Sequence, residues 1–162
     1  MLEYCDPETR ELALAPPPTS VWMHCRTVME MHCILFDLHG ARVLRSIALD
    51  TVRSGLSPFL RSSVESVLRL FGTSPATLLS RMSTMAGSTT KGVEWKWTSE
   101  SPRSGVLEMR YAKGANAPMS AFISAAGGLE FVMGITGTSG TISNPEMVMD
   151  GLYSAARYVV RW

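Results

Sequence analysis

Two His-Cys pairs stand eight residues apart in the N-terminal third of the sequence, at His24-Cys25 and His32-Cys33, and His39 follows them. Imidazole and thiolate groups are common ligands of zinc and of other transition metals. On one helix, however, positions eight apart are separated by about 12 Å, so the two pairs cannot share one ion without a break in the helix. We expect instead that Cys25 and His32 face a core while His24 and Cys33 are more exposed, and a metal site built from these four residues is the alternative.

The sequence offers no clear set of catalytic groups. Its three histidines all lie between positions 24 and 39, and no Gly-x-Ser-x-Gly motif places a serine nucleophile. The spaced glycines Gly134, Gly137 and Gly140 lack the lysine of a phosphate-binding loop. We therefore expect a domain that binds or senses something rather than an enzyme.

Composition indicates one folded domain. The chain has 162 residues, of which 46% are hydrophobic and 18% are charged, which excludes general disorder. The net charge of +1, with basic residues spread along the chain, disfavours nucleic acid as a partner. Three cysteines without a Cys-x-x-Cys motif indicate a reducing compartment, and every apolar run is shorter than the ~20 residues of a membrane helix. These features predict a cytoplasmic protein that does not insert into membranes.

The helical elements are expected mainly in the first half of the chain. Residues 1–19, which include Pro16-Pro17-Pro18, predict an extended lead-in, and residues 20–162 are expected to form a single domain. Within that domain, apolar residues recur at helical spacing between glycine and Ser-Pro boundaries. Four N-terminal helices are predicted at about residues 19–40, 43–55, 57–72 and 74–87.

After residue 92 the apolar period changes from helical to two. Alternating residues from Val93 to Trp97 and from Leu107 to Tyr111 predict an antiparallel hairpin with one wet face. A later helix is predicted with Asn116 as its cap, and its pair Gly127-Gly128 indicates a close approach of the sheet or of a ligand. Residues 146–149 and 153–162 predict a closing strand pair. The fold class is therefore α+β, with about four N-terminal helices and one later helix packed as a layer on a small antiparallel sheet.

Aromatic residues are the best candidates for the lining of an apolar pocket between the helices and the sheet. Ordinary core packing is the alternative explanation for the same residues. The candidate ligand-binding residues are Trp22, Trp95, Trp97, Tyr111 and Phe122.

Several weak motifs together resemble a known family. They are the helix-turn-helix stretch from Leu56 to Gly87 with its Leu-Phe-Gly-Thr-Ser-Pro turn, the Trp-rich hairpin, the Gly-Gly helix and the closing Tyr158-Val-Val-Arg-Trp162. The chain resembles, over residues 20–162, a family of paralogous myxobacterial domains of unknown function. That family is related to the superfamily of the heme-nitric-oxide-binding domain, the 4-vinyl-reductase domain and the Bet3-type subunits of the Golgi transport complex. The resemblance implies a helical layer over a small sheet, an apolar cavity between them and a sensing, regulatory or assembly role.

The heme-binding branch of that superfamily implies an axial histidine and a Tyr-x-Ser-x-Arg element that holds the heme propionates. The nearest match begins at Tyr153 and ends at Arg157, with Ser154 one place early, and it falls in the predicted final strand. The sequence therefore favours no cofactor, with heme and zinc as alternatives.

The favoured function is a non-enzymatic ligand-binding, sensing or regulatory domain that holds a small apolar ligand. The first alternative is a protein-interaction or assembly module that forms a homodimer or pairs with another protein. The second alternative is a metal-binding protein that uses the two His-Cys pairs.

Overall fold

The computed structural model describes residues 2–18, 23–55, 74–82, 90–151 and 153–162, together with the single residues 66, 68, 70, 72 and 84. The helical elements are η1 (Leu2–Tyr4), α1 (Pro7–Leu14), α2 (Cys25–Gly55), α4 (Pro75–Ser80) and α6 (Met119–Ile135). The strands are β1 (Val93–Ser101), β2 (Ser104–Tyr111), β3 (Thr141–Ile142), β4 (Glu146–Asp150) and β5 (Tyr153–Arg161).

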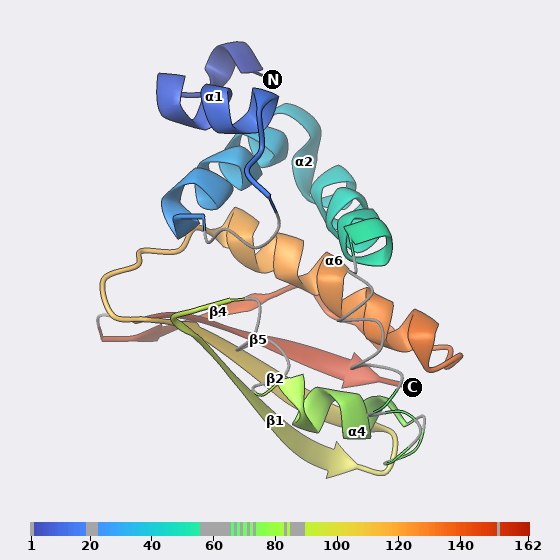
Figure 1. Cartoon of the computed structure of the whole chain (residues 1–162). Coiled ribbons are helices and arrows are strands. Elements are labelled where there is room, and N and C mark those ends of the chain that lie inside the picture. Colours follow the sequence, from blue (N-terminus) through green and yellow to red (C-terminus); the bar gives the residue numbers. More distant parts are fainter. Residues whose placement is uncertain are drawn as a thin grey trace.

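The fold is α+β, as predicted, with a helical layer on one face of a five-stranded antiparallel sheet. Helix α6 lies on the sheet, α2 lies on α6, and α1 lies on the far side of α2 (Figure 1). Helix α4 contacts both β1 and α6. In the sheet, β2 pairs with β1 on one side and β5 on the other, while β3 and β4 both pair with the far edge of β5.

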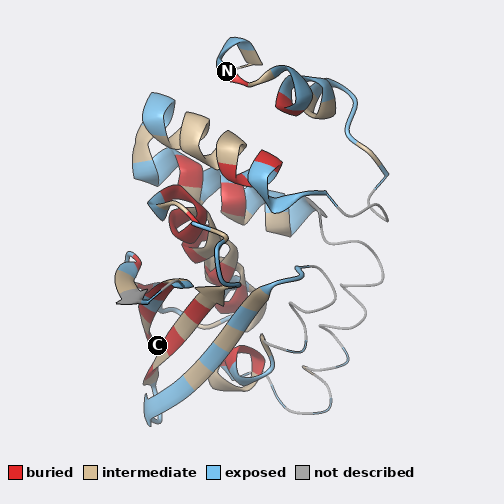
Figure 2. Ribbon diagram, turned by 90° about the vertical axis from the view of Figure 1, so that its left-hand side faces the viewer, coloured by how far each residue is buried: buried red, intermediate tan, exposed pale blue. Residues whose placement is uncertain are grey.

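The two faces of the sheet have opposite character. On the outer face, Lys96, Glu108, Arg157 and Glu146 stand in one row across four strands with alternating charge. Within that row Arg157 Nε donates to Glu108 Oε1 at 2.7 Å. The other face, which meets the helices, carries the apolar alternation that the sequence predicts for both hairpins. Water therefore solvates one face, and the helices cover the other (Figure 2).

The centre of the core lies between α6 and strands β2 and β5. Phe122 of α6 and Tyr158 of β5 are both fully buried. The Tyr158 hydroxyl donates to the main-chain carbonyl of Phe122 at 3.0 Å and also lies 3.7 Å from the Met109 sulfur. Burial raises the pKa of the Tyr158 phenol, so this hydroxyl remains a donor at physiological pH. The bond fixes α6 over the centre of the sheet.

Helices α2 and α6 cross at a glycine. A Cβ atom built on Gly127 would collide with the main-chain carbonyl of Arg45 and would lie 3.0 Å from the Ala48 Cβ. The sequence predicted that the sheet or a ligand approaches the Gly-Gly pair, and that prediction was wrong about the neighbour. Helix α2 makes the close approach, because α6 is covered by the sheet on one side and by α2 on the other.

Arg45 connects three segments beside that crossing. Its Nε donates to Glu130 Oε1 of α6 at 2.6 Å. Its Nη2 donates to the carbonyl of Ile142 in β3 at 2.5 Å, and its Nη1 donates to Asn144 Oδ1 at 3.1 Å. The forked guanidinium therefore ties α2 both to α6 and to the far edge of the sheet.

The N-terminal segment is partly helical, which corrects the predicted extended lead-in. Asp6 caps α1 by accepting a hydrogen bond from the Thr9 amide at 2.8 Å, and Pro7 occupies the first turn, where its missing N–H is not needed. Glu30 of α2 then accepts from the Asp6 amide and from the Thr9 hydroxyl, each at 2.8 Å. The prolines were given too much weight, since only Pro16-Pro17-Pro18 lie outside the helix.

The structure confirms some of the other predicted helix boundaries and corrects one. A break at Gly40 is confirmed, because this residue has a φ of 77° and separates two helical halves of α2. Helix α4 begins at Pro75 as predicted, but the predicted helix over 57–72 lies largely outside the described residues. Helix α6 begins at Met119 with Pro118 as its cap, whereas Asn116 has a φ of 46° and does not cap the helix.

Candidate functional site

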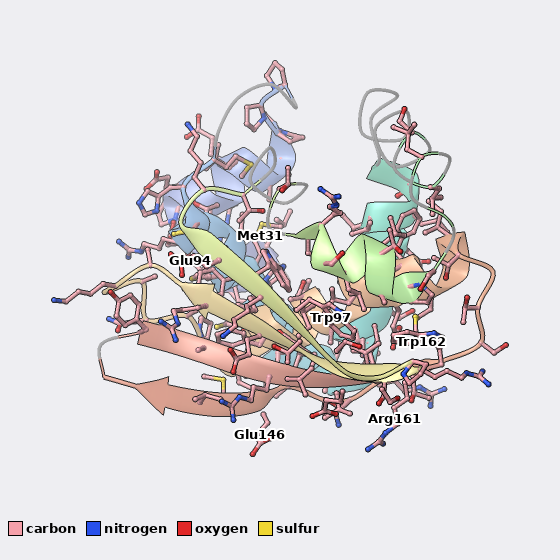
Figure 3. All side chains as sticks on the ribbon, turned by 90° about the horizontal axis from the view of Figure 1, so that it is seen from below. Met31, Glu94, Trp97, Glu146, Arg161 and Trp162 are labelled. Carbon is pink, nitrogen blue, oxygen red and sulfur yellow. The ribbon has the colours of Figure 1, made fainter. Side chains whose placement is uncertain are left out.

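Aromatic side chains line the helix-facing side of β1 and β2. Trp95 and Trp97 are neighbours along β1, and they pair across the ladder with Met109 and Leu107 of β2. Both indoles are half-buried and pack against the edge of the core. Trp97 also lies beside Trp162, with ring centroids 6.1 Å apart (Figure 3). The two strands thus present a wide aromatic surface toward the helices.

Tyr111 and Phe122 continue this surface toward α6. Their rings meet edge to face, with centroids 5.4 Å apart and an interplanar angle of 82°. Burial, and secondarily the nearby Cys25 thiol, raise the pKa of the Tyr111 phenol to about 12. Tyr111 is therefore neutral at physiological pH, and its ring contributes apolar contact rather than charge.

Trp95 carries the most unusual polar atom of this surface. Its indole Nε1 is buried, and it has no hydrogen-bond partner among the described residues. A buried donor left without an acceptor is destabilising by about 1–3 kcal/mol, so native structures rarely keep one without a reason. The neighbouring side chains on this face, Val93, Trp97 and Met109, are apolar.

The structure brings four of the five predicted ligand-binding residues to the helix-facing side of the sheet. Trp95, Trp97 and Tyr111 project from the helix-facing side of the sheet, and Phe122 meets them from α6. Trp22 lies outside the described residues. Trp162 was not among the candidates, although its alternation with Tyr158 and Val160 already indicated that it faces the helices.

The His-Cys pairs do not converge. His24 and Cys25 are exposed, and the His24 Nδ1 accepts the Arg26 amide at 3.2 Å. Across the interface between α2 and α6, His32 Nε2 lies 3.1 Å from Ser124 Oγ, and Cys33 Sγ lies 3.3 Å from Ser120 Oγ. The part of the chain that the structure describes contains no group of three His, Cys, Asp or Glu residues placed to hold a metal ion.

The prediction that Cys25 faces the core and that Cys33 is more exposed was wrong. Cys25 is exposed, whereas Cys33 is half-buried against α6. His32 faces the interface, as expected, and burial lowers its pKa. The reason is that His32 and Cys33 contact α6, so the buried face of this part of α2 runs through these two residues and not through Cys25 at its first turn.

The residues available for heme do not fit the pattern that the resemblance to the heme-binding branch implied. In β5, Tyr153 and Arg157 lie on the outer face of the sheet, and period-two alternation turns Ser154 to the opposite face. Arg157 is paired with Glu108. The chain has three histidines: His24 and His39 are exposed, and His32 contacts Ser124 between two packed helices. An imidazole ligand and a propionate clamp are therefore not assembled on one site.

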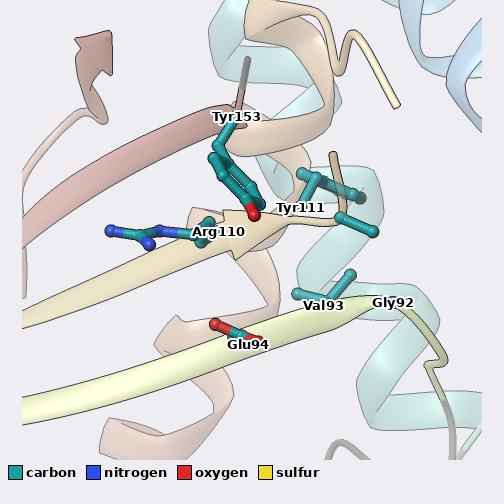
Figure 4. Close-up of a pocket in the computed structure, with 7 residues that line it drawn as sticks. Gly92, Val93, Glu94, Arg110, Tyr111 and Tyr153 are labelled. Carbon is teal, nitrogen blue, oxygen red and sulfur yellow. The ribbon is translucent and has the colours of Figure 1, made fainter. Parts of the chain in front are cut away.

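A small hollow lies at the end of the sheet where β1 begins and β2 ends. Its volume is about 220 Å³. Glu94 and Arg110 are direct neighbours across the strands, and the Arg110 guanidinium carbon lies 5.4 Å from the centre of the Tyr153 ring (Figure 4). The lining residues are Gly92, Val93, Glu94, Arg110, Tyr111, Ala112 and Tyr153. Glu94 and Arg110 make this hollow charged, whereas the helix-facing aromatic side chains, of which it shares Tyr111, are uncharged.

Known structures with a similar fold are H-NOX domains. An oxygen-binding H-NOX domain related to soluble guanylate cyclases, in its oxygen complex, matches with a TM-score of 0.61 at 10% identity, over 87% of this chain and 73% of that chain. A structure from a study of H-NOX activation matches with a TM-score of 0.60 at 11% identity, over 94% of this chain and 84% of that chain. A third, from work on heme redox potential and porphyrin distortion, matches with a TM-score of 0.61 at 10% identity, over 88% and 78% of the two chains.

These likenesses show that the chain shares the fold of H-NOX domains. No protein-family model and no curated protein sequence matches the chain. Within the described residues, no helix combines the length and the apolar character that a membrane span requires.

Proposed function

We propose that this chain is a non-enzymatic ligand-binding domain with a sensing or regulatory role, which holds a small apolar molecule between the aromatic face of its sheet and the helices. The observation that carries the proposal is the fold, because the similar structures are H-NOX domains and one of them is described as oxygen-binding. A fold shared with binding domains supports binding only by analogy, so the site itself has to supply the chemistry.

The aromatic surface supports an apolar ligand. Trp95, Trp97 and Tyr111 are half-buried rather than fully packed, so part of each ring remains available for contact. Ligand sites are usually lined by aromatic side chains with a few polar groups that fix orientation. The geometry of Ser154 and of the three histidines disfavours heme. His32 and Cys33 contact serines of α6 and do not converge with the exposed His24 and Cys25, which disfavours zinc.

A neutral fluorescent probe tests this proposal. N-phenyl-1-naphthylamine should bind the protein saturably, at one molecule per chain, with an increase in its fluorescence. The substitution Trp97→Leu should weaken binding, because it removes a large part of the aromatic surface. Tyr153→Leu is the matched control, since this aromatic residue lies on the outer face and should leave binding unchanged. Absence of saturable binding to the wild-type chain would contradict the proposal.

An assembly module is the second candidate, and exposed apolar residues on α2 favour it. Leu38, Val43 and Ile47 are 42%, 41% and 39% exposed. A homodimer or a complex with another protein would remove them from water. Sedimentation equilibrium distinguishes the two candidates, because a dimer that dissociates in the Val43→Glu variant would support assembly through α2.

A further inference from the structure

We infer that the ligand of the aromatic surface is a neutral, planar and largely apolar molecule with one hydrogen-bond acceptor, which meets the indole Nε1 of Trp95. This inference rests on the proposed function and specifies the chemistry of the same site. It starts from two observations, the buried donor of Trp95 and the distribution of charge over the two faces of the sheet.

Among the described residues, the Trp95 donor has no hydrogen-bond acceptor within reach. Trp95 pairs with Met109 across the ladder, and Val93 and Trp97 flank it along β1. Helix α4, which contacts β1, adds the buried and apolar Leu78 and Leu79. Because Nε1 is buried and finds no acceptor among the described residues, a carbonyl, ether or ring nitrogen of a ligand would satisfy it.

The charge distribution favours a neutral ligand. On the helix-facing side, β1, β2 and β5 present mainly apolar residues together with the uncharged Ser154, Tyr111 and Tyr158. The charged residues of the same strands, such as Glu94, Lys96 and Arg110, occupy the outer face. An ionised group placed against the aromatic surface would lose water without gaining a counter-charge from the helix-facing side chains of these strands, which is strongly unfavourable.

The aromatic side chains on this face favour a flat ligand. Trp95 and Trp97 stand two residues apart on the same face of β1, and the Trp97 ring lies over Gly105 of β2 and beside Trp162, so flat rings line this side of the sheet. Tyr111 pairs with Val93 across the ladder, and its ring contacts Phe122 of α6 at the end of that surface. The Trp95 donor lies within this surface and therefore fixes the orientation of the ligand rather than supplying most of its affinity.

Two probes of the same shape test the inference. 2-Acetylnaphthalene carries a carbonyl acceptor, and 2-isopropenylnaphthalene replaces that oxygen with a methylene group. The wild-type protein should bind the ketone about three- to tenfold more tightly by calorimetry, as expected for one neutral hydrogen bond. The Trp95→Phe variant should bind both probes equally. The matched control Trp97→Phe should keep the preference for the ketone.

A spectroscopic measurement on the wild-type protein keeps the inference testable even if a variant folds poorly. The four tryptophans should give separate indole N–H resonances in a ¹⁵N-labelled sample, and the ketone should shift the Trp95 resonance downfield more than the alkene does. Equal binding of the two probes to the wild type, or a ketone shift at another indole, would overturn the inference and leave the proposed function standing. Failure of both probes to bind would overturn both, and tighter binding of 2-naphthoate would overturn neutrality.

Discussion

Gly127 of α6 lies against the main-chain carbonyl of Arg45 in α2, with no space for a side chain between the two helices. This contact sets how closely α2 approaches the layer that covers the sheet. Because the neighbour is backbone rather than a flexible side chain, the helices cannot adjust without moving apart.

The substitution Gly127→Ala should therefore destabilise the protein by about 2 kcal/mol or more, despite the higher helix propensity of alanine. Gly134 in the same helix is the matched control, because a Cβ atom there would meet nothing within 4 Å. Gly134→Ala should be neutral or stabilising by up to about 1 kcal/mol. Urea denaturation measures both variants, and equal effects would show that the crossing is not the cause.

Arg45→Met should lower the free energy of unfolding by about 1–3 kcal/mol, because it leaves the carbonyl of Ile142 and the carboxylate of Glu130 without their donor. The partly exposed Glu130 can be rehydrated, which limits the loss. Arg53→Met is the comparison, since the Arg53–Asp50 pair is exposed and should contribute almost nothing. A loss no larger for Arg45→Met than for Arg53→Met would contradict the role given to Arg45.

The pH dependence of stability should report on His32. Burial lowers its pKa in the folded protein, so below the ordinary value of 6.5 the unfolded chain binds a proton that the folded chain does not. By linkage, the free energy of unfolding should fall as the pH decreases below about 6.5, by at most about 1.4 kcal/mol per pH unit from this group. His32→Asn should remove part of that slope between pH 7.5 and 5.5, whereas His39→Asn on the exposed side should retain it. An unchanged slope in His32→Asn would show that the imidazole is not held neutral.

The docking of α1 should depend on Glu30, which accepts hydrogen bonds from both the amide of Asp6 and the hydroxyl of Thr9. Glu30→Ala should accelerate amide hydrogen exchange in residues 7–14 while leaving α6 protected. Glu11→Ala, on the exposed side of α1, is the control and should leave exchange in that helix nearly unchanged. Unaltered exchange in Glu30→Ala would mean that α1 is held by other contacts.

The sequence predicted the local features well, because hairpins and helix breaks depend on nearby residues. The alternation around Trp95 and the break at Gly40 needed only neighbouring positions. The partner of Gly127 could not be predicted, since it depends on packing with a segment about eighty residues earlier in the chain. The prediction of which α2 residues are buried was wrong for the same reason. Helices α1 and α6 cover different sides of α2, so no single apolar stripe marks its buried face.

The candidate site was predictable in its residue types but not in its chemistry. Alternation identified Trp95, Trp97 and Tyr111 as members of one face. The sequence gives no sign that the Trp95 indole nitrogen lacks a partner, because that property depends on every side chain around it.

Native mass spectrometry of freshly purified protein, with an absorption spectrum of the same sample from heme-supplemented cells, tests the central claim most directly. The account predicts a non-covalent mass excess from a small organic molecule and no Soret band, because the three histidines and Ser154 do not assemble a heme site. A stoichiometric heme mass with a Soret band that disappears in His32→Ala would contradict it.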